Sequence, residues 1–476
     1  MRRKTLLSTT PSFRLPRAAT IVVMLVIIAI SAPAHAQVRL KSQDRGSYRP
    51  PTVPAAERSD TPSGREAFTS GGPALVEQVG YDAALQPLGL PSPYEPAMES
   101  LAPYHPADIG CDMQGCDGCG SCAPRHDWFA SAELMLWWRR PQSLPALVTT
   151  SDPGTAFESA GELGQASTSV LFGNDRYGDS VSTGGRFTLG KWLDAGHYQS
   201  LTGRFWLTGS EDFGFHTNST SNPIIARPFL DFTTNPAGEA NAVVVAFPNR
   251  RDASLTVEGT SEVYGADVSL QQLIRQGLGG RLDFMYGYQF LRINEDLHIR
   301  SDTLFTGAGD TSPVGTLRIL RDQFDVENEF HGGHFGFSGY YEEGCWTLDG
   351  LIKFGFGSLT RRGTASGSTE TIINGTSGFD PGGGLLVRNS NAGAFSDSTF
   401  AWVPELNVNL GYHWRPGVDL SIGYSVLGLT DALQPWRAID PNLASDLSDT
   451  PTRPAPELSY GDYWVQAIQF GIRWYY

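Results

Sequence analysis

The sequence contains no apolar run beyond residue 40 that is long enough to cross a membrane as a helix. It has no basic excess either: 35 Lys and Arg stand against 50 Asp and Glu, a net charge of −15, which argues against nucleic acid as a partner. A G-x-S-x-G nucleophile elbow and an H-E-x-x-H zinc motif are both missing. We therefore expect neither a helical membrane protein nor an enzyme, and no cofactor or bound metal.

The first 36 residues have the features of a secretory signal peptide. An apolar run at 21–30 precedes Ala34-His35-Ala36, which fits a small-x-small cleavage site. The positive charges before the run are Arg2, Arg3, Lys4, Arg14 and Arg17. Because the run is shorter than a membrane-spanning helix normally requires, we predict cleavage after Ala36 and export from the cytoplasm.

Residues 37–127 follow neither a helical nor a strand period and are rich in Pro, Ser, Gly and Ala. Such a composition cannot bury enough apolar surface to offset the entropy lost on ordering. We predict a disordered periplasmic arm that ends in a cysteine cluster. The cluster consists of Cys111, Cys116, Cys119 and Cys122.

The spacing of this cluster, C-x4-C-x2-C-x2-C, allows three interpretations: disulfides within or between chains, a metal or iron–sulfur site, or no specific role. Four close thiols can chelate zinc or hold an iron–sulfur cluster. Export to an oxidising compartment favours disulfides instead, so we take the four cysteines as candidate disulfide residues. Cys345 brings the total to five, an odd number. Titration of thiols before and after reduction separates the alternatives.

From residue 128 onward, apolar and polar side chains alternate with the period of two that is typical of β-strands. The last strand has an apolar face of Tyr476, Trp474, Ile472, Phe470 and Ile468, and a small or polar face of Arg473, Gly471, Gln469 and Ala467. Ten segments alternate in this way: 128–138, 186–190, 200–207, 264–270, 281–290, 324–340, 346–356, 400–414, 418–426 and 463–476. An aromatic C-terminal strand is typical of the closing strand of an outer-membrane β-barrel.

Short and long connections alternate between these segments. The short turns are 194–197, 276–280, 342–344 and 415–417, and the long links are 139–182, 209–255, 294–320, 359–398 and 430–461. Outer-membrane barrels have this asymmetry of periplasmic turns and extracellular loops, whereas a soluble β-sandwich or propeller has no reason for it. We predict an all-β, antiparallel transmembrane β-barrel over 128–476. It has about ten strands, or twelve if parts of the long links, such as 359–373, pair as further hairpins.

Several segments, in order, also carry a resemblance to a known family. They are 129–138, 144–150, 170–173, 184–190, 264–268, 281–283, 287–288, 330–333 and 403–412. Together they resemble the bacterial family called putative beta-barrel porin seven, over about 125–476. The resemblance implies an outer-membrane barrel of unknown function, typical of planctomycetes, and supplies no functional residues to carry over.

Charged residues occur on the face predicted to point into the barrel. They are Glu133, Arg204, Asp267, Arg281, Asp283, Asp349, Lys353, Glu405 and Arg473. Because buried charges need partners, we expect them to pair across a narrow lumen and close it, or to line water in a wider one. The sequence leaves both possibilities open.

Two motifs resemble binding sites but fit strands better. Residues 185–191 match most of a phosphate-binding loop, yet Trp192 stands where a Ser or Thr should follow, and the run alternates as a strand. His331 and His334 could offer two imidazoles to a metal, but residues three apart on a strand face opposite sides. We expect structural roles for both.

These observations predict an outer-membrane protein whose partners are the lipid bilayer and, during biogenesis, the barrel-assembly machinery. The first function that we consider is porin-like passive transport of small solutes. The alternative is a structural or surface-interaction barrel with a plugged lumen, anchored through its cysteine-containing arm. A barrel enzyme would need paired carboxylates or a Ser–His pair at the loop ends, and we identify no convincing set. The sequence predicts neither the solute nor the oligomeric state.

Overall fold

The computed structural model describes residues 127–476 except 178–179, 234, 278, 311, 445–452 and 457. The predicted signal peptide, the predicted arm up to residue 126 and the four clustered cysteines lie outside the described residues. No helix in the described part is long and apolar enough to span a membrane.

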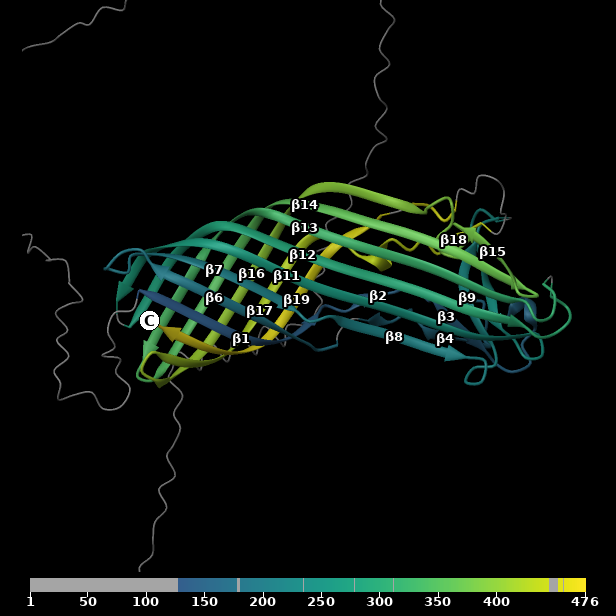
Figure 1. The fold of residues 1–476 in the computed structure, drawn as a ribbon, viewed down its shortest axis with the longest axis horizontal. Coiled ribbons are helices and arrows are strands. Elements are labelled where there is room, and N and C mark those ends of the chain that lie inside the picture. Colours follow the sequence, from purple (N-terminus) through teal and green to yellow (C-terminus); the bar gives the residue numbers. More distant parts are fainter. Residues whose placement is uncertain are drawn as a thin grey trace, which may run out of the picture. The chain divides into compact units, whose positions relative to one another are not determined.

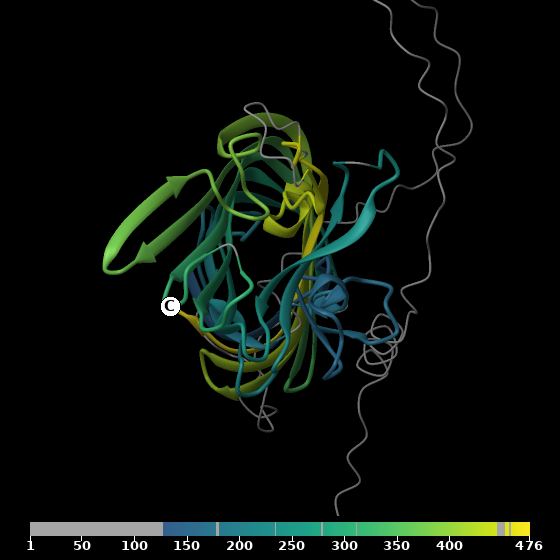
Figure 2. The same ribbon diagram turned by 90° about the vertical axis from the view of Figure 1, so that its right-hand side faces the viewer.

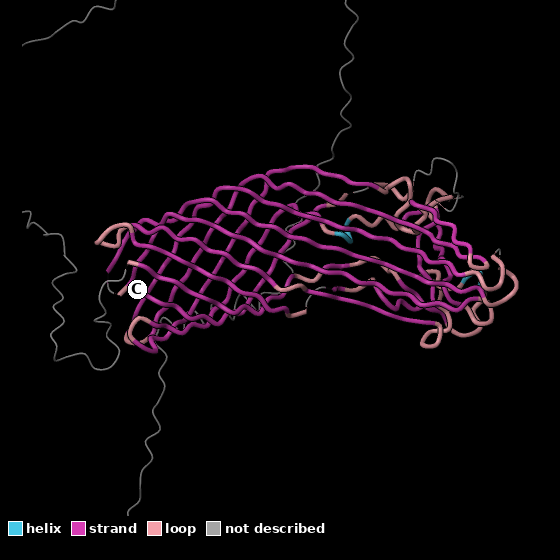
Figure 3. Tube along the Cα trace, in the orientation of Figure 1, coloured by secondary structure: helices cyan, strands magenta, loops and turns pink. Residues whose placement is uncertain are grey.

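Ten antiparallel strands form a closed ring, which Figure 2 shows from one end and Figures 1 and 3 show from the side. They are β1 (Trp128–Arg139), β6 (Ser182–Trp192), β7 (Gln199–Thr208), β11 (Arg251–Gly277), β12 (Gly280–Phe305), β13 (Leu317–Glu343), β14 (Trp346–Ile373), β16 (Gly393–Arg415), β17 (Val418–Leu433) and β19 (Tyr460–Tyr475). Their order is β11-β12-β13-β14-β16-β17-β19-β1-β6-β7, and β7 pairs with β11. The predicted fold class is therefore confirmed.

The first and last strands close the ring. β1 and β19 pair from Phe129 opposite Tyr475 to Arg139 opposite Val465. The backbone N–H of Tyr476 also donates to the carbonyl of Trp128 at 2.8 Å. The aromatic terminal strand is thus joined on both edges, since β17 lies on its other side.

Four short turns lie at the same end of the ring as Tyr476, which we call the turn end (Figure 1). Gly344 and Gly417 adopt positive φ angles of 63° and 74° there, which glycine accepts without steric cost. Asp194 caps the first turn by accepting hydrogen bonds from the N–H groups of Tyr198 and Gln199 at 2.9 and 2.7 Å. We call the opposite end the loop end.

Five ring strands continue beyond the others towards the loop end. β11, β12, β13 and β14 have 27, 26, 27 and 28 residues and β16 has 23, against 12 in β1. Parts of the predicted links 209–255, 294–320 and 359–398 are therefore strand. Residues 359–373 extend β14, and the end of this extension forms a hairpin with β15 (Thr376–Pro381), from Ser368 opposite Pro381 to Ile373 opposite Thr376. The link therefore contains a further hairpin, as the sequence allowed. β8 (Glu211–Asn218) pairs with the extension of β11.

A second sheet packs inside the extensions. It contains β3 (Val148–Ser151), β4 (Thr168–Phe172), β9 (Ile225–Asp231), β10 (Glu239–Ala246) and β18 (Asn442–Leu443), in the order β10-β9-β3-β4 with β18 parallel to β9. Short pieces complete this end: β2 (Gln142–Ser143), β5 (Arg176–Tyr177), and the 3-10 turns η2 (Phe157–Ser159) and η3 (Pro435–Arg437). Val148, Ile225 and Val245 of the second sheet share one buried cluster with Leu255 and Ile299 of the extensions.

The apolar face of the ring strands reverses along their length. Between the turn end and Phe290, β12 exposes Tyr286 and Tyr288, whereas beyond Phe290 its apolar residues Leu297 and Ile299 are buried inside. We call the segments on the turn side of this boundary the membrane half, and the remainder the loop half. In the membrane half, exposed apolar side chains occur on all ten strands: Leu134, Phe187, Phe205, Val268, Tyr288, Phe335, Ile352, Trp402, Ile422 and Phe470. A surrounding bilayer requires such a belt.

Candidate functional site: the filled lumen

Four charged side chains meet in the lumen of the membrane half. Lys353 on β14 contacts Asp267 on β11 at 2.9 Å and Glu405 on β16 at 2.7 Å. Arg204 on β7 contacts the same two carboxylates at 2.7 and 2.8 Å. The Lys353 and Asp267 side chains are both 0% exposed. Two cations and two anions thus balance each other in the centre of the ring, which is what burial of charge requires.

Glycines on the inward face let the wall bend around this charge cluster. A Cβ atom added to Gly287 on β12 would lie 1.9 Å from the carbonyl oxygen of Val268, and one added to Gly336 on β13 would lie 2.3 Å from that of Ile352. Real Cβ atoms do not approach so closely, so these positions require glycine. We infer that this bend of the wall brings β11 and β14 near enough for Lys353 to reach Asp267.

Polar side chains extend the charge cluster around the ring. The Arg186 guanidinium donates to Glu133 at 2.7 Å and to Gln469 at 3.0 Å. Gln469 also donates to Asn407 and Asn409. The structure therefore adds Arg186, Gln469, Asn407 and Asn409 to the predicted lumen residues. Asn407 and Asn409 have the same strand phase as Glu405, and Gln469 has that of Arg473. Arg186 lies opposite Glu133. The strand pattern could therefore have identified all four.

The remaining predicted lumen charges form two pairs nearer the turn end. Arg281 contacts Asp283 at 2.6 Å, and Arg473 contacts Asp349 at 2.8 Å. Of the nine predicted residues, the structure thus brings four into the central cluster and places four in these two pairs. Glu133 pairs with Arg186, which was not among the predicted lumen charges.

An apolar layer lies on the loop side of the charge cluster. It contains Met135, Trp137, Trp206, Leu291, Phe330, Val403, Leu427 and Val465, all buried. The rings of Trp137 and Trp206 are 5.7 Å apart. Large apolar side chains from strands around the ring therefore share one buried cluster in the lumen at this level.

A second polar layer follows at the base of the loop half. Arg139, at the end of β1, contacts Glu211 at 2.8 Å and Glu295 on β12 at 2.5 Å. The hydroxyl of Ser261 donates to Glu295 at 3.2 Å. Burial raises the pKa of Glu295 to about 7, against the attraction of Arg139. Glu211 and Glu295 lie in predicted links, so neither was expected inside.

The loop half closes above this second polar layer. Arg227 on β9 contacts Asp322 on β13 at 2.6 Å. Asp322 also accepts the backbone N–H groups of Leu386 and Val387 at 2.9 and 2.8 Å. The apolar cluster of the two sheets surrounds this pair. In the described part of the chain, polar and apolar layers thus alternate from the turn end to the loop end.

The two motifs that resembled binding sites lie on ring strands. Residues 185–191 belong to β6. His331 faces outward beside the Tyr288 hydroxyl at 2.5 Å, whereas the His334 ring is buried 2.9 Å from the Ser269 hydroxyl. Within the described ranges, no three His, Cys, Asp or Glu side chains form a group suited to a metal ion. Cys345, in the turn before β14, is disulfide-bonded.

Residues 129–476 match the family described as putative beta barrel porin-7 (BBP7). The chain belongs to this family. Its apolar belt and closed ring accordingly make it an outer-membrane β-barrel protein. We expect the turn end on the periplasmic side, because tight turns are typical of that side. A search of curated proteins gave no match.

Comparison with solved structures gives several matches at low identity. The outer membrane protease OmpT from Escherichia coli aligns with 75% of this chain and 100% of its own, at 9% identity and a TM-score of 0.34. The toluene transporter TodX from Pseudomonas putida aligns with 75% of this chain and 91% of its own, at 10% identity and a TM-score of 0.14. A FadL homologue from Pseudomonas aeruginosa aligns with 74% and 90%, at 4% identity and a TM-score of 0.20. At these scores the likenesses carry no argument about activity.

Proposed function

We propose that this family member is a closed outer-membrane barrel that holds its packed loop half at the cell surface, with a structural or surface-interaction role. The observation that carries the proposal is the central cluster of Arg204, Asp267, Lys353 and Glu405. Its four charges satisfy one another across the lumen at 2.7–2.9 Å. The apolar layer above it would also have to move before a solute could pass.

Conductance across a planar lipid bilayer tests this proposal. We expect the wild-type barrel, with its fold checked by heat-modifiable migration on a gel, to give no steps of stable size. A variant that truncates both layers, Lys353→Ala with Glu405→Ala, Trp137→Ala and Phe330→Ala, should conduct. Stable steps from the wild type would overturn the closed barrel.

Porin-like passive transport is the second candidate, and the description of the family favours it. It requires the lumen layers to part in the membrane. Uptake of neutral sugars into liposomes containing the wild-type protein is the readout that supports this candidate. If the wild-type protein both conducts ions across the bilayer and lets sugars into liposomes, passive transport is its function.

The proposal also includes the predicted export signal and arm. We infer that the mature chain begins after Ala36 and that Cys345 links the periplasmic side of the barrel to the arm. N-terminal sequencing of the protein from outer membranes tests the cleavage. Peptide mapping without reduction should find Cys345 joined to the 111–122 segment, and recovery of Cys345 joined to a different protein would contradict the link.

A further inference from the structure

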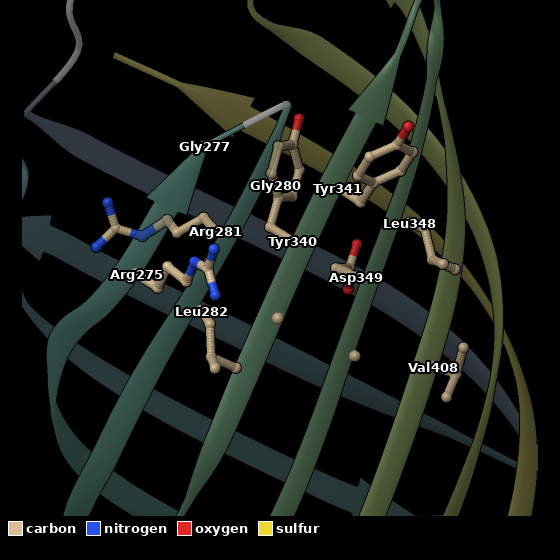
Figure 4. A pocket seen from close by; sticks show the side chains of 12 residues that line it. Arg275, Gly277, Gly280, Arg281, Leu282, Tyr340, Tyr341, Leu348, Asp349 and Val408 are labelled. Carbon is tan, nitrogen blue, oxygen red and sulfur yellow. The ribbon is translucent and has the colours of Figure 1, made fainter. Parts of the chain in front are cut away.

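A hollow of about 480 Å³ opens on the outer face of the membrane half, near the turn end (Figure 4). Its floor is one row across four neighbouring strands: Leu282 on β12 lies opposite Gly339 on β13, Gly339 opposite Gly350 on β14, and Gly350 opposite Val408 on β16. We call this row the glycine hollow. It belongs to the bilayer-facing surface because Leu282 is among the exposed apolar residues.

The two glycines create the hollow without being needed for the packing of the wall. A Cβ atom at Gly339 would meet nothing closer than the Arg281 carbonyl oxygen at 3.9 Å, and one at Gly350 nothing closer than that of Asn407 at 3.7 Å. The neighbouring rows carry large residues: Tyr341 and Leu348 on the turn side, and Phe337 and Ile352 on the other. The floor is therefore lower than its two sides, and a linear hydrocarbon chain matches this shape.

The glycine hollow also runs inward from the bilayer surface. Leu282 is two residues from Gly280, where β12 begins, and Gly339 and Gly350 are each four residues from the turn-end limits of their strands, Glu343 and Trp346. Val408 is seven residues from Arg415, the last residue of β16. The row thus descends from the periplasmic interface towards the middle of the membrane, the path that a lipid acyl chain takes.

A cation stands at the shallow end of this row. Arg275 on β11 lies opposite Leu282 and is exposed, and its guanidinium is directed towards β12 (Figure 4). In the described part of the chain, Arg275 makes no ion pair, whereas Arg281 pairs with Asp283 and Arg415 stacks on Trp414 at 4.2 Å. Arginine suits phosphate because its planar fork of donors matches the phosphate oxygens.

We propose that the glycine hollow binds one glycerophospholipid of the periplasmic leaflet. Its phosphate lies on Arg275, and one acyl chain lies over Gly339 and Gly350 towards Val408. The Tyr341 ring, at the rim of the hollow, covers the glycerol region, where tyrosine is favoured at a membrane interface. The site is on the outer wall, so it holds whether the lumen conducts or not.

Native mass spectrometry of the full-length, delipidated protein in detergent tests the site, with phosphatidylglycerol, diacylglycerol and inorganic phosphate as probes. We expect one phosphatidylglycerol molecule to remain bound at collision energies that strip diacylglycerol, and inorganic phosphate not to compete. Gly339→Leu with Gly350→Leu fills the floor and should reduce retention at least tenfold. Gly203→Leu is the matched control, because Gly203 has the same outward phase on β7 and open space around its Cβ position.

Arg275→Gln separates the headgroup from the acyl chain. It should lower retention of phosphatidylglycerol to that of diacylglycerol while leaving the gel mobility of the folded barrel unchanged. The proposal is overturned if the leucine pair retains lipid as the wild type does. It is also overturned if Arg275→Gln has no effect, or if Gly203→Leu loses as much lipid as the leucine pair.

Discussion

The two halves of this protein use the same strands with opposite polarity. In the membrane half, Ile352 and Phe354 of β14 face outward and Lys353 faces the lumen, whereas in the loop half of the same strand Arg362 faces outward and Ala365 lies inside. Water surrounds the loop half, so burial of apolar side chains drives its sheets together. Hydrocarbon surrounds the membrane half, where polar contacts and close packing must specify the interior instead. The strand period alone therefore does not fix which face is apolar; the surroundings do.

Of the changes considered for the two halves, removal of one member of the charge cluster should lower the free energy of unfolding the most. Lys353→Met leaves Asp267 and Glu405 with only Arg204, and an unpaired buried charge costs about 3–5 kcal/mol. We expect that loss in the free energy of unfolding from lipid vesicles, followed by tryptophan fluorescence in denaturant. The double variant Lys353→Met with Glu405→Gln restores the balance of charge, so it should be more stable than Lys353→Met alone. Additive losses would mean that the four groups do not act as a unit.

The second largest effect should come from one outward-facing charge, which we expect to destabilise the membrane half but not the loop half. Ile352→Lys places a cation on the bilayer-facing side near the middle of the β14 span and should cost about 2–4 kcal/mol. Thr364→Lys has the same outward phase on the same strand but lies in the loop half, where we expect a change within about 0.5 kcal/mol. The same vesicle unfolding assay measures both. Equal costs would place the bilayer boundary elsewhere.

The ring could be predicted from the sequence because the membrane half alternates without interruption. The ten segments, the four turns and the closing strand all follow from that alternation. The loop half was missed because its phase reverses: in β12 the apolar residues shift from even positions, such as Tyr288 and Phe290, to odd ones, such as Leu291 and Ile293. A search for one constant face ends the strand at that shift, although the period of two continues.

The lumen could be predicted only in part for a related reason. The inward phase identified which charges face inside, but pairing between β11 and β14 depends on how sharply the wall bends. That curvature arises from close backbone approach at Gly287 and Gly336. The second polar layer was not predicted, because Glu211 and Glu295 sit in segments that the sequence assigned to links.

The second polar layer gives the smallest effect and a pH dependence. The Glu295 carboxyl interacts with Arg139 of β1, Glu211 of β8, Ser261 of β11, Asp296 of its own strand and Tyr463 of β19. Its pKa in the folded protein is about 7, against an ordinary value of 4.5. Between these values the folded state binds the extra proton. Stability should therefore fall as pH rises from about 4.5 to about 7, by at most roughly 3 kcal/mol, and change little above that range.

Glu295→Gln isolates this contribution, because the amide keeps the size of the side chain and cannot lose a proton in this range. The difference in free energy of unfolding between the wild type and this variant, measured at pH 5 and pH 8, should shift in favour of the variant at pH 8. Glu258→Gln, which changes an outward carboxylate on β11 in the same half, should give no such shift. A pH response that survives in Glu295→Gln would assign it to other carboxylates. It would also mean that Glu295 does not titrate between the membrane half and the loop half, and that packing alone stabilises this layer.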